Sequence, residues 1–264
     1  MKFKAIFPNM LTAGNLLFGL AAIFFAFGMF YSIEYAFICM LLAAACDLLD
    51  GMLARALRVQ SEFGKQLDSL SDIVSFGVAP AFTVFFILLR HSYDLEISNI
   101  HKYLFFIIPA LFAVSAAFRL AKFNIDSKQT KNFRGLPTPA AALFVVSFSL
   151  YWANFFGQNN IFNSILIVTF LFSVLMLLPV SILSMKLHDA KSRIFALIML
   201  VTSILIVWFF SYSGVSIIIL LYILLSFIII YIFPLFCKKT ISEKKEVSEN
   251  SCFERNCAFY HRKV

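Results

Sequence analysis

The sequence has 264 residues, of which 61% are hydrophobic and only 14% charged, and its mean hydropathy is +0.90. Soluble domains carry roughly 25% charged and about 45–50% apolar residues, because much of their surface faces water. The composition therefore excludes a soluble enzyme, a disordered chain and a small disulfide-stapled domain. It indicates an all-α polytopic membrane protein.

The net charge is +8, with 22 Lys and Arg against 14 Asp and Glu. A basic balance of this size can indicate nucleic acid as a partner, but in a membrane protein it is typical of topology and of anionic lipid headgroups. We therefore expect the basic residues to meet a lipid bilayer and no nucleic acid.

Eight apolar stretches are long enough to cross a bilayer, which needs roughly 20 residues at 1.5 Å each. Their predicted ranges are 11–31, 33–57, 66–90, 101–122, 137–156, 161–185, 194–211 and 214–236. The following tail, 237–264, is polar and mixed in charge without apolar periodicity, and we expect it to be disordered.

The distribution of Lys and Arg predicts how these spans are oriented. If the N-terminus is cytoplasmic and eight helices alternate, 20 of the 22 basic residues lie on the cytoplasmic side, and only Arg90 and Lys102 do not. This arrangement follows the positive-inside rule, so both termini are predicted to be cytoplasmic.

Four acidic residues cluster where charge enters the apolar segments. Asp47 and Asp50 lie three residues apart near the end of the second predicted span, and Asp68 and Asp72 lie four apart near the start of the third. Each pair therefore shares one helix face, and the short link between the spans makes them antiparallel neighbours. We expect the four carboxylates to converge just inside the cytoplasmic boundary.

Such a cluster needs a cation, because each ionised Asp at mid-membrane costs roughly 2.5–3.5 kcal/mol. Arg55 alone cannot neutralise four carboxylates. Hard oxygen ligands on rigid helices suit Mg²⁺ or Mn²⁺, and the number of carboxylates suits two ions. The sequence thus predicts an acidic divalent-metal site in the membrane.

Eight fixed residues run through this region as Asp47-x-x-Asp50-Gly51-x-x-Ala54-Arg55, eight residues, then Gly64-x-x-x-Asp68-x-x-x-Asp72. The pattern resembles the signature of the CDP-alcohol phosphatidyltransferase family at every fixed position. The resemblance implies the family's six-helix core, here residues 1–193, with 194–236 as two additional transmembrane helices. It also implies a homodimer.

The resemblance further implies a reaction and residue roles. In this family the first three acidic positions bind metal and grip the nucleotide pyrophosphate, and the fourth acts as the base. Carried over, Asp47, Asp50 and Asp68 are metal ligands, and Asp72 both helps to bind the second metal and takes the acceptor proton. The expected contacts of CDP are Asn9, Thr12, Asn15, Asp47, Gly51, Ala54, Arg55 and Gly64. Asn9 and Thr12 are equally compatible with capping the first helix.

Two further segments resemble the phosphatidylserine synthase branch of the family. They are the run from Pro8 to Asn15 and the loop that begins Arg119-Leu120-Ala121-Lys122-Phe123-Asn124 and continues from Phe133 to Ala140. This likeness implies transfer of a phosphatidyl group from CDP-diacylglycerol to L-serine, with release of CMP. Because arginine suits a carboxylate or phosphate, Arg119 and Arg134, with Asn124, are candidate contacts of the acceptor or the lipid phosphate.

Two alternatives remain at this point. One is the same reaction with glycerol-phosphate, inositol or choline as the acceptor. The other is a metal-ion transporter, although the outer halves of the spans carry almost no ionisable residue that would continue an ion path.

Overall fold

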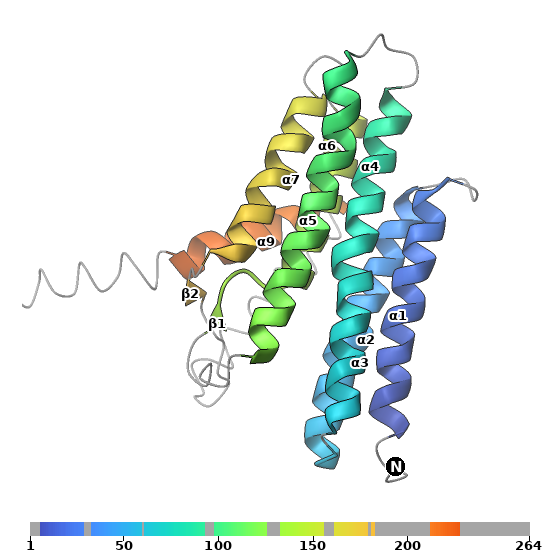
Figure 1. Ribbon diagram of the computed structural model, residues 1–264, viewed down its shortest axis with the longest axis vertical. Helices are drawn as coiled ribbons and strands as arrows, with labels where there is room; N and C mark the ends of the chain where they lie inside the picture. The colour runs from blue at the N-terminus through green and yellow to red at the C-terminus, as the bar shows by residue number, and fades with distance from the viewer. Residues whose placement is uncertain are drawn as a thin grey trace, which may run out of the picture. The chain divides into compact units, whose positions relative to one another are not determined.

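The computed structural model describes residues 6–28, 33–59, 61–92, 98–125, 133–155, 161–178, 181–182 and 212–227. Its helices are α1 (Ile6–Ala26), α2 (Ile33–Leu57), α3 (Glu62–Ile73), η2 (Val74–Val78), α4 (Ala79–His91), α5 (Asn99–Ile125), α6 (Thr138–Phe155), α7 (Ile161–Leu177) and α9 (Tyr212–Phe227). Two-residue strands β1 (Phe133–Arg134) and β2 (Ser181–Ile182) pair antiparallel. The predicted helical membrane fold is confirmed (Figure 1).

Five helical stretches are long and apolar enough to cross a membrane, and they match the first five predicted spans. The helix α7, of 17 residues, lies within the sixth predicted span, and α9, of 16 residues, begins two residues before the eighth. The predicted span 194–211 and the tail 237–264 lie outside the described residues, as do the predicted boundaries at 193 and 236. Contacts divide the chain into a large unit, Met1–Leu220, and a smaller one, Leu221–Val264.

The first helix begins at Ile6, five residues before its predicted start, and ends at Ala26. Pro8 lies in its first turn, where a missing N–H costs little because that donor has no helical partner. Asn9 and Thr12 therefore lie inside α1, and neither caps its N-terminus.

Residues of the first helix show how the large unit faces its surroundings. Leu17 and Phe24 are 66% and 62% exposed, whereas Thr12 and Asn15 are 3% and 0% exposed. A surface that is apolar and an interior that holds polar side chains are what a lipid environment selects. These exposures support the prediction of an integral membrane protein.

The helix α2 ends in a tight reversal that places the two acidic segments together. Arg58 has φ 53°, and the N–H of Val59 donates to the carbonyl of Ala54 over 3.1 Å. This is the left-handed helix stop in which a 6→1 hydrogen bond closes the last turn. Ser61 then caps α3 by accepting from the N–H of Gly64 at 3.0 Å.

The third span is helical throughout, Glu62–His91, and contains one widened π turn, η2. Pro80 is the second residue after this turn. A proline removes one helical hydrogen bond and crowds the carbonyl four residues earlier, here that of Phe76 within η2. The widened turn relieves that crowding, two residues beyond Asp72.

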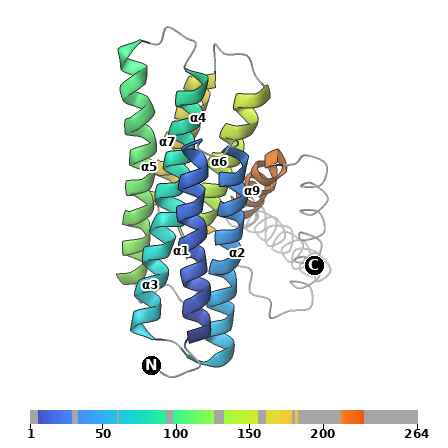
Figure 2. The ribbon, with the colours of Figure 1, turned by 90° about the vertical axis from the view of Figure 1, so that its right-hand side faces the viewer.

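The helix α1 packs against both α2 and α3, and Figure 2 shows it between them. The approach to the third span is close at Gly19, where a Cβ would come within 2.9 Å of the Cα of Ser75. Only glycine permits this distance. On the other side, α3 and η2 contact α5.

Candidate active site

Three of the four predicted carboxylates meet at one point. Asp47 and Asp50 of α2 and Asp68 of α3 each offer an oxygen, and these oxygens lie within 4.8 Å of one another. The three-residue spacing on α2 turns both of its carboxylates to one face, and the reversal after Leu57 brings α3 beside that face. The arrangement can hold a metal ion.

The hydrogen bonding of these carboxylates is incomplete, which fits a cation. Oδ1 of Asp68 is buried and has no hydrogen-bond partner among the described residues. Asp50 is 5% exposed, and its Oδ2 accepts from the hydroxyl of Thr12 at 2.6 Å. A buried carboxylate oxygen without a donor is costly, and a hard divalent cation provides the missing partner.

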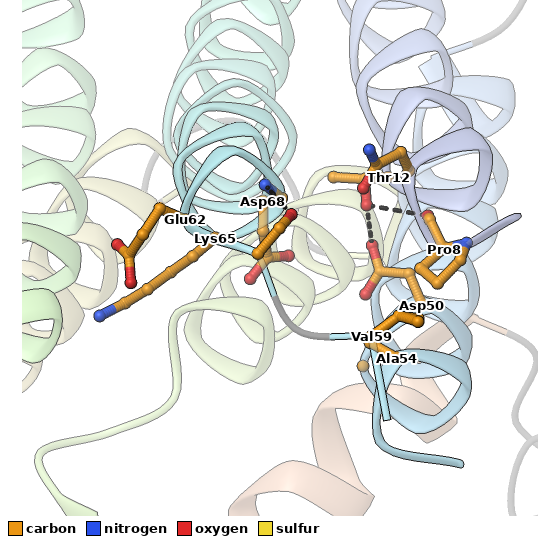
Figure 3. A pocket seen from close by; sticks show the side chains of 12 residues that line it. Pro8, Thr12, Asp50, Ala54, Val59, Glu62, Lys65 and Asp68 are labelled. Atoms are coloured by element: carbon orange, nitrogen blue, oxygen red, sulfur yellow. Dashed lines mark hydrogen bonds between the residues drawn. The ribbon is translucent and has the colours of Figure 1, made fainter. Parts of the chain in front are cut away.

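A cavity of about 590 Å³ opens beside the three carboxylates. Figure 3 shows Thr12 of α1, Asp50 of α2 and Asp68 of α3 around it. Its lining consists of Pro8, Asn9, Thr12, Asp50, Gly51, Ala54, Val59, Ser61, Glu62, Gly64, Lys65 and Asp68. Two membrane helices and the start of a third thus enclose a space large enough for a substrate headgroup.

Five of the eight predicted nucleotide contacts line this cavity: Asn9, Thr12, Gly51, Ala54 and Gly64. A Cβ added to Gly51 would meet nothing within 4 Å, so this glycine leaves open space. At Gly64 a Cβ would approach Oδ1 of Asn9 to 3.2 Å, so this glycine allows helices α1 and α3 to meet closely. The two glycines of the signature therefore serve different purposes.

Arg55 and Asn15 are not among the lining residues. Arg55 is exposed, and its Nε donates to the carbonyl of Gly51 on its own helix at 2.9 Å. Asn15 is fully buried, and its Nδ2 donates to Oδ1 of Asp72 at 3.1 Å. Both were predicted to contact CDP, as was Asp47, and none of the three is among the lining residues of the cavity.

Asp72 lies one helical turn beyond Asp68 and outside the group of three carboxylates that meet within 4.8 Å. It still interacts electrostatically with Asp47 and Asp68. The predicted set of four thus comprises three carboxylates that converge and a fourth that hydrogen-bonds with Asp47 and accepts a hydrogen bond from Asn15.

The predicted loop residues lie on the α5 side of α3. Arg119 donates through a terminal guanidinium nitrogen to the hydroxyl of the buried Thr138, at the start of α6, and its Nε is buried without a hydrogen-bond partner among the described residues. Arg119 also interacts electrostatically with Asp72. Asn124 donates to Oγ of Ser69 at 2.7 Å, which ties the end of α5 to α3. Arg134 lies in β1, and its side chain lies outside the described residues.

Several residues at the site were missed by the sequence analysis. Ser61, Glu62 and Lys65 line the cavity from the start of α3, and Pro8 and Val59 complete its lining. The sequence signal for Ser61 was present, since serine before a helix is a preferred cap. Lys65 lies three residues before Asp68, but this spacing alone did not show that it would border the cavity.

Comparison with known proteins assigns this architecture. The family model for CDP-alcohol phosphatidyltransferase matches residues 5–175, which include every helix from α1 to nearly the end of α7. The chain belongs to the CDP-alcohol phosphatidyltransferase family.

Curated relatives of this chain carry related names. A CDP-diacylglycerol–serine O-phosphatidyltransferase of Helicobacter pylori is 36% identical over 145 residues, which is 53% of this chain and 56% of the relative. An enzyme of the same name from Bacillus subtilis is 33% identical over 142 residues, 54% of this chain and 74% of the relative. An archaetidylserine synthase of Methanothermobacter thermautotrophicus is 39% identical over 129 residues, 48% of this chain and 50% of the relative. The chain thus spans about half the length of several relatives that it matches.

We expect the three converging carboxylates to bind Mn²⁺. Substituting Asp68→Asn should weaken Mn²⁺ binding by more than about tenfold, because even changes to residues that only orient metal ligands cost roughly 10–100-fold. Titration of Mn²⁺ followed by electron paramagnetic resonance measures the affinity of detergent-purified protein. Glu62→Gln is the matched control, since it removes an exposed cavity carboxylate outside the group of three. Equal affinities of Asp68→Asn and Glu62→Gln would contradict the assignment.

Proposed function

We propose that the chain transfers the phosphatidyl group of CDP-diacylglycerol to L-serine and releases CMP. The observation that carries the proposal is the convergence of Asp47, Asp50 and Asp68 beside a cavity that Asp50 and Asp68 line, in a chain of a phosphatidyltransferase family. The names of the relatives, which include serine phosphatidyltransferases and an archaetidylserine synthase, support serine as the acceptor.

We propose that Asp47, Asp50 and Asp68 hold Mg²⁺ or Mn²⁺, with Asp72 contributing to a second ion. Bound there, the metal offsets the negative charge of the pyrophosphate, which the acidic site would otherwise repel. Thr12 fixes the Asp50 carboxyl by its hydrogen bond, so one ligand is oriented before any substrate enters.

The cavity would take the nucleotide. Asn9 and Thr12 line it from α1, and Gly51 and Ala54 line it from α2, while Gly64 borders it from α3. Oxygen and nitrogen atoms of the first two can bind the nucleotide, and the space at Gly51 admits its bulk. Nδ2 of Asn9 is buried without a partner among the described residues and is available as a donor.

In the proposed reaction, the serine hydroxyl oxygen forms a bond to the β-phosphorus while the bond from that phosphorus to the CMP oxygen breaks. A serine hydroxyl needs a base within hydrogen-bond reach to accept its proton. We propose that the Asp72 carboxylate accepts it, and that CMP carries away the electron pair of the broken bond. The serine carboxylate or the lipid phosphate would lie against Arg119, with Asn124 and Arg134 nearby.

The proposal includes where the chain acts and how it is organised. The positions of Lys and Arg support a cytoplasmic active site and two cytoplasmic termini in an integral membrane protein. We also propose a homodimer, a catalytic core in residues 1–193, additional helices in 194–236 and a disordered tail in 237–264. A metal-ion transporter is not favoured, since the family and its relatives are named for group transfer.

One assay tests the proposed function. Purified protein is given CDP-diacylglycerol and either Mn²⁺ or Mg²⁺, together with serine, glycerol-phosphate, inositol or choline, and CMP release is measured. We expect release with serine that EDTA abolishes and added metal restores. Release with another acceptor only would overturn serine, and full activity in the presence of EDTA would overturn the role of the metal.

The role of Asp72 as base predicts a selective kinetic defect. Asp72→Asn preserves the shape of the side chain but removes its ability to accept a proton. We expect kcat to fall by roughly 10²–10⁴, the usual contribution of general-base catalysis, while the KM for CDP-diacylglycerol changes little. Steady-state kinetics with both substrates varied measures the two effects. A lost lipid affinity with normal turnover of bound substrate would make Asp72 a metal ligand only.

The proposed role of Arg119 predicts a defect in serine binding. Arg119→Ala should raise the KM for serine well before it affects the KM for CDP-diacylglycerol, because it removes a cation from the acceptor side of α3. Lys122→Ala is the control on the same helix, since Lys122 is exposed. A change confined to the KM of the lipid substrate would move Arg119 to the lipid phosphate.

A further inference from the structure

Among the described residues, the side chain of Asn15 is buried and donates hydrogen bonds to residues of the third span. Its Nδ2 donates to Oδ1 of Asp72 at 3.1 Å and approaches Oγ of Ser71 at 3.4 Å. Its backbone carbonyl accepts from the hydroxyl of Ser75 at 2.9 Å. Asn15 is 0% exposed, so a ligand in the cavity cannot touch it without displacing α1 from the third span.

We propose that Asn15 is a positioning residue that acts through Asp72, and not a contact of the nucleotide. The proposal rests on the proposed function, in which Asp72 accepts the proton of serine. Because an ionised carboxylate only accepts hydrogen bonds, the amide nitrogen of Asn15 must face it. This bond holds Oδ1 of Asp72 and fixes the orientation of the carboxyl group that receives the proton.

The surroundings of Asn15 are built to hold this geometry. Oγ of Ser71 accepts a hydrogen bond from the same amide nitrogen, and the Ser71 hydroxyl donates to the carbonyl of Asp68 at 2.8 Å. Ser75 fixes the backbone of Asn15 from the π turn, and Gly19 lets α1 come close enough for that bond. A side chain locked by packing and by hydrogen bonds from two directions holds its partner more accurately than a mobile one.

The arrangement explains why a neutral amide is used at this position. Arg119 already interacts electrostatically with Asp72, and a second cation at position 15 would form an ion pair and compete with the serine hydroxyl for the carboxylate. An amide donates one hydrogen bond without adding a charge. The carboxylate therefore keeps its negative charge available for the acceptor.

Kinetics of the purified chain test the proposal through a double-mutant cycle. Asn15→Ala should lower kcat for CMP release with serine by about 10–100-fold, the usual effect of removing a residue that orients a reactive group, with little change in the KM for CDP-diacylglycerol. In the Asp72→Asn background the same substitution should have almost no further effect on kcat, because its target is already gone. Ser149→Ala is the matched control: it removes a buried serine hydroxyl, bonded to the carbonyl of Val145 at 2.7 Å, on a helix to which no site role is assigned, and it should leave kcat near normal.

Other outcomes would overturn the proposal. A raised KM for CDP-diacylglycerol with a normal kcat would make Asn15 a nucleotide contact, and additive effects of Asn15→Ala and Asp72→Asn would make its role merely structural. If Asn15→Ala does not fold, Asn15→Asp keeps the size of the side chain but replaces the donor by an acceptor, and the same cycle applies. A wild-type chain that releases no CMP with serine would instead overturn the proposed function. Coupling of the two substitutions in thermal unfolding would still show whether Asn15 and Asp72 interact.

Discussion

The site depends on keeping several carboxylates close together inside a membrane. Asp47, Asp50 and Asp68 bring oxygens within 4.8 Å, although their charges repel one another and each loses hydration on burial. The fold reduces this cost with polar groups from the first helix, since Thr12 donates to Asp50 and Asn15 donates to Asp72. The remaining cost favours a bound cation, because a fully satisfied carboxylate would gain less from a metal.

The helix α1 therefore has two different faces. Leu17 and Phe24 are exposed on the side that meets lipid, whereas Thr12 and Asn15 are directed to the acidic residues of α2 and α3. A small residue at the crossing, Gly19, allows these short polar side chains to reach across. Longer side chains could span a wider gap, but they would lose more conformational entropy and hold the carboxylates less accurately.

The sequence predicted those parts of the site that depend on local spacing. Asp47 and Asp50, three residues apart on a helix predicted at 33–57 and observed over Ile33–Leu57, had to share a face, and a short reversal had to bring Asp68 near. It did not predict which way α1 is rotated against α3, so Asn15 was assigned to the nucleotide although it bonds Asp72. That rotation depends on the contact of Gly19 with Ser75 and on the π turn before Pro80, which are properties of helix packing and not of periodicity.

The place of α3 bears on how two substrates could react. In both Figure 1 and Figure 2, α3 lies between α1 and α5. The cavity is lined by α1, α2 and the start of α3, whereas Arg119 interacts with Asp72 from α5. Direct displacement at phosphorus needs the attacking and leaving oxygens roughly in line on opposite sides. Under the proposed reaction, a nucleotide in the cavity and an acceptor beside Arg119 would approach from different sides of α3, and Asp72 lies on the helix between them. The helix that carries the metal ligand Asp68 would then also set the line of attack.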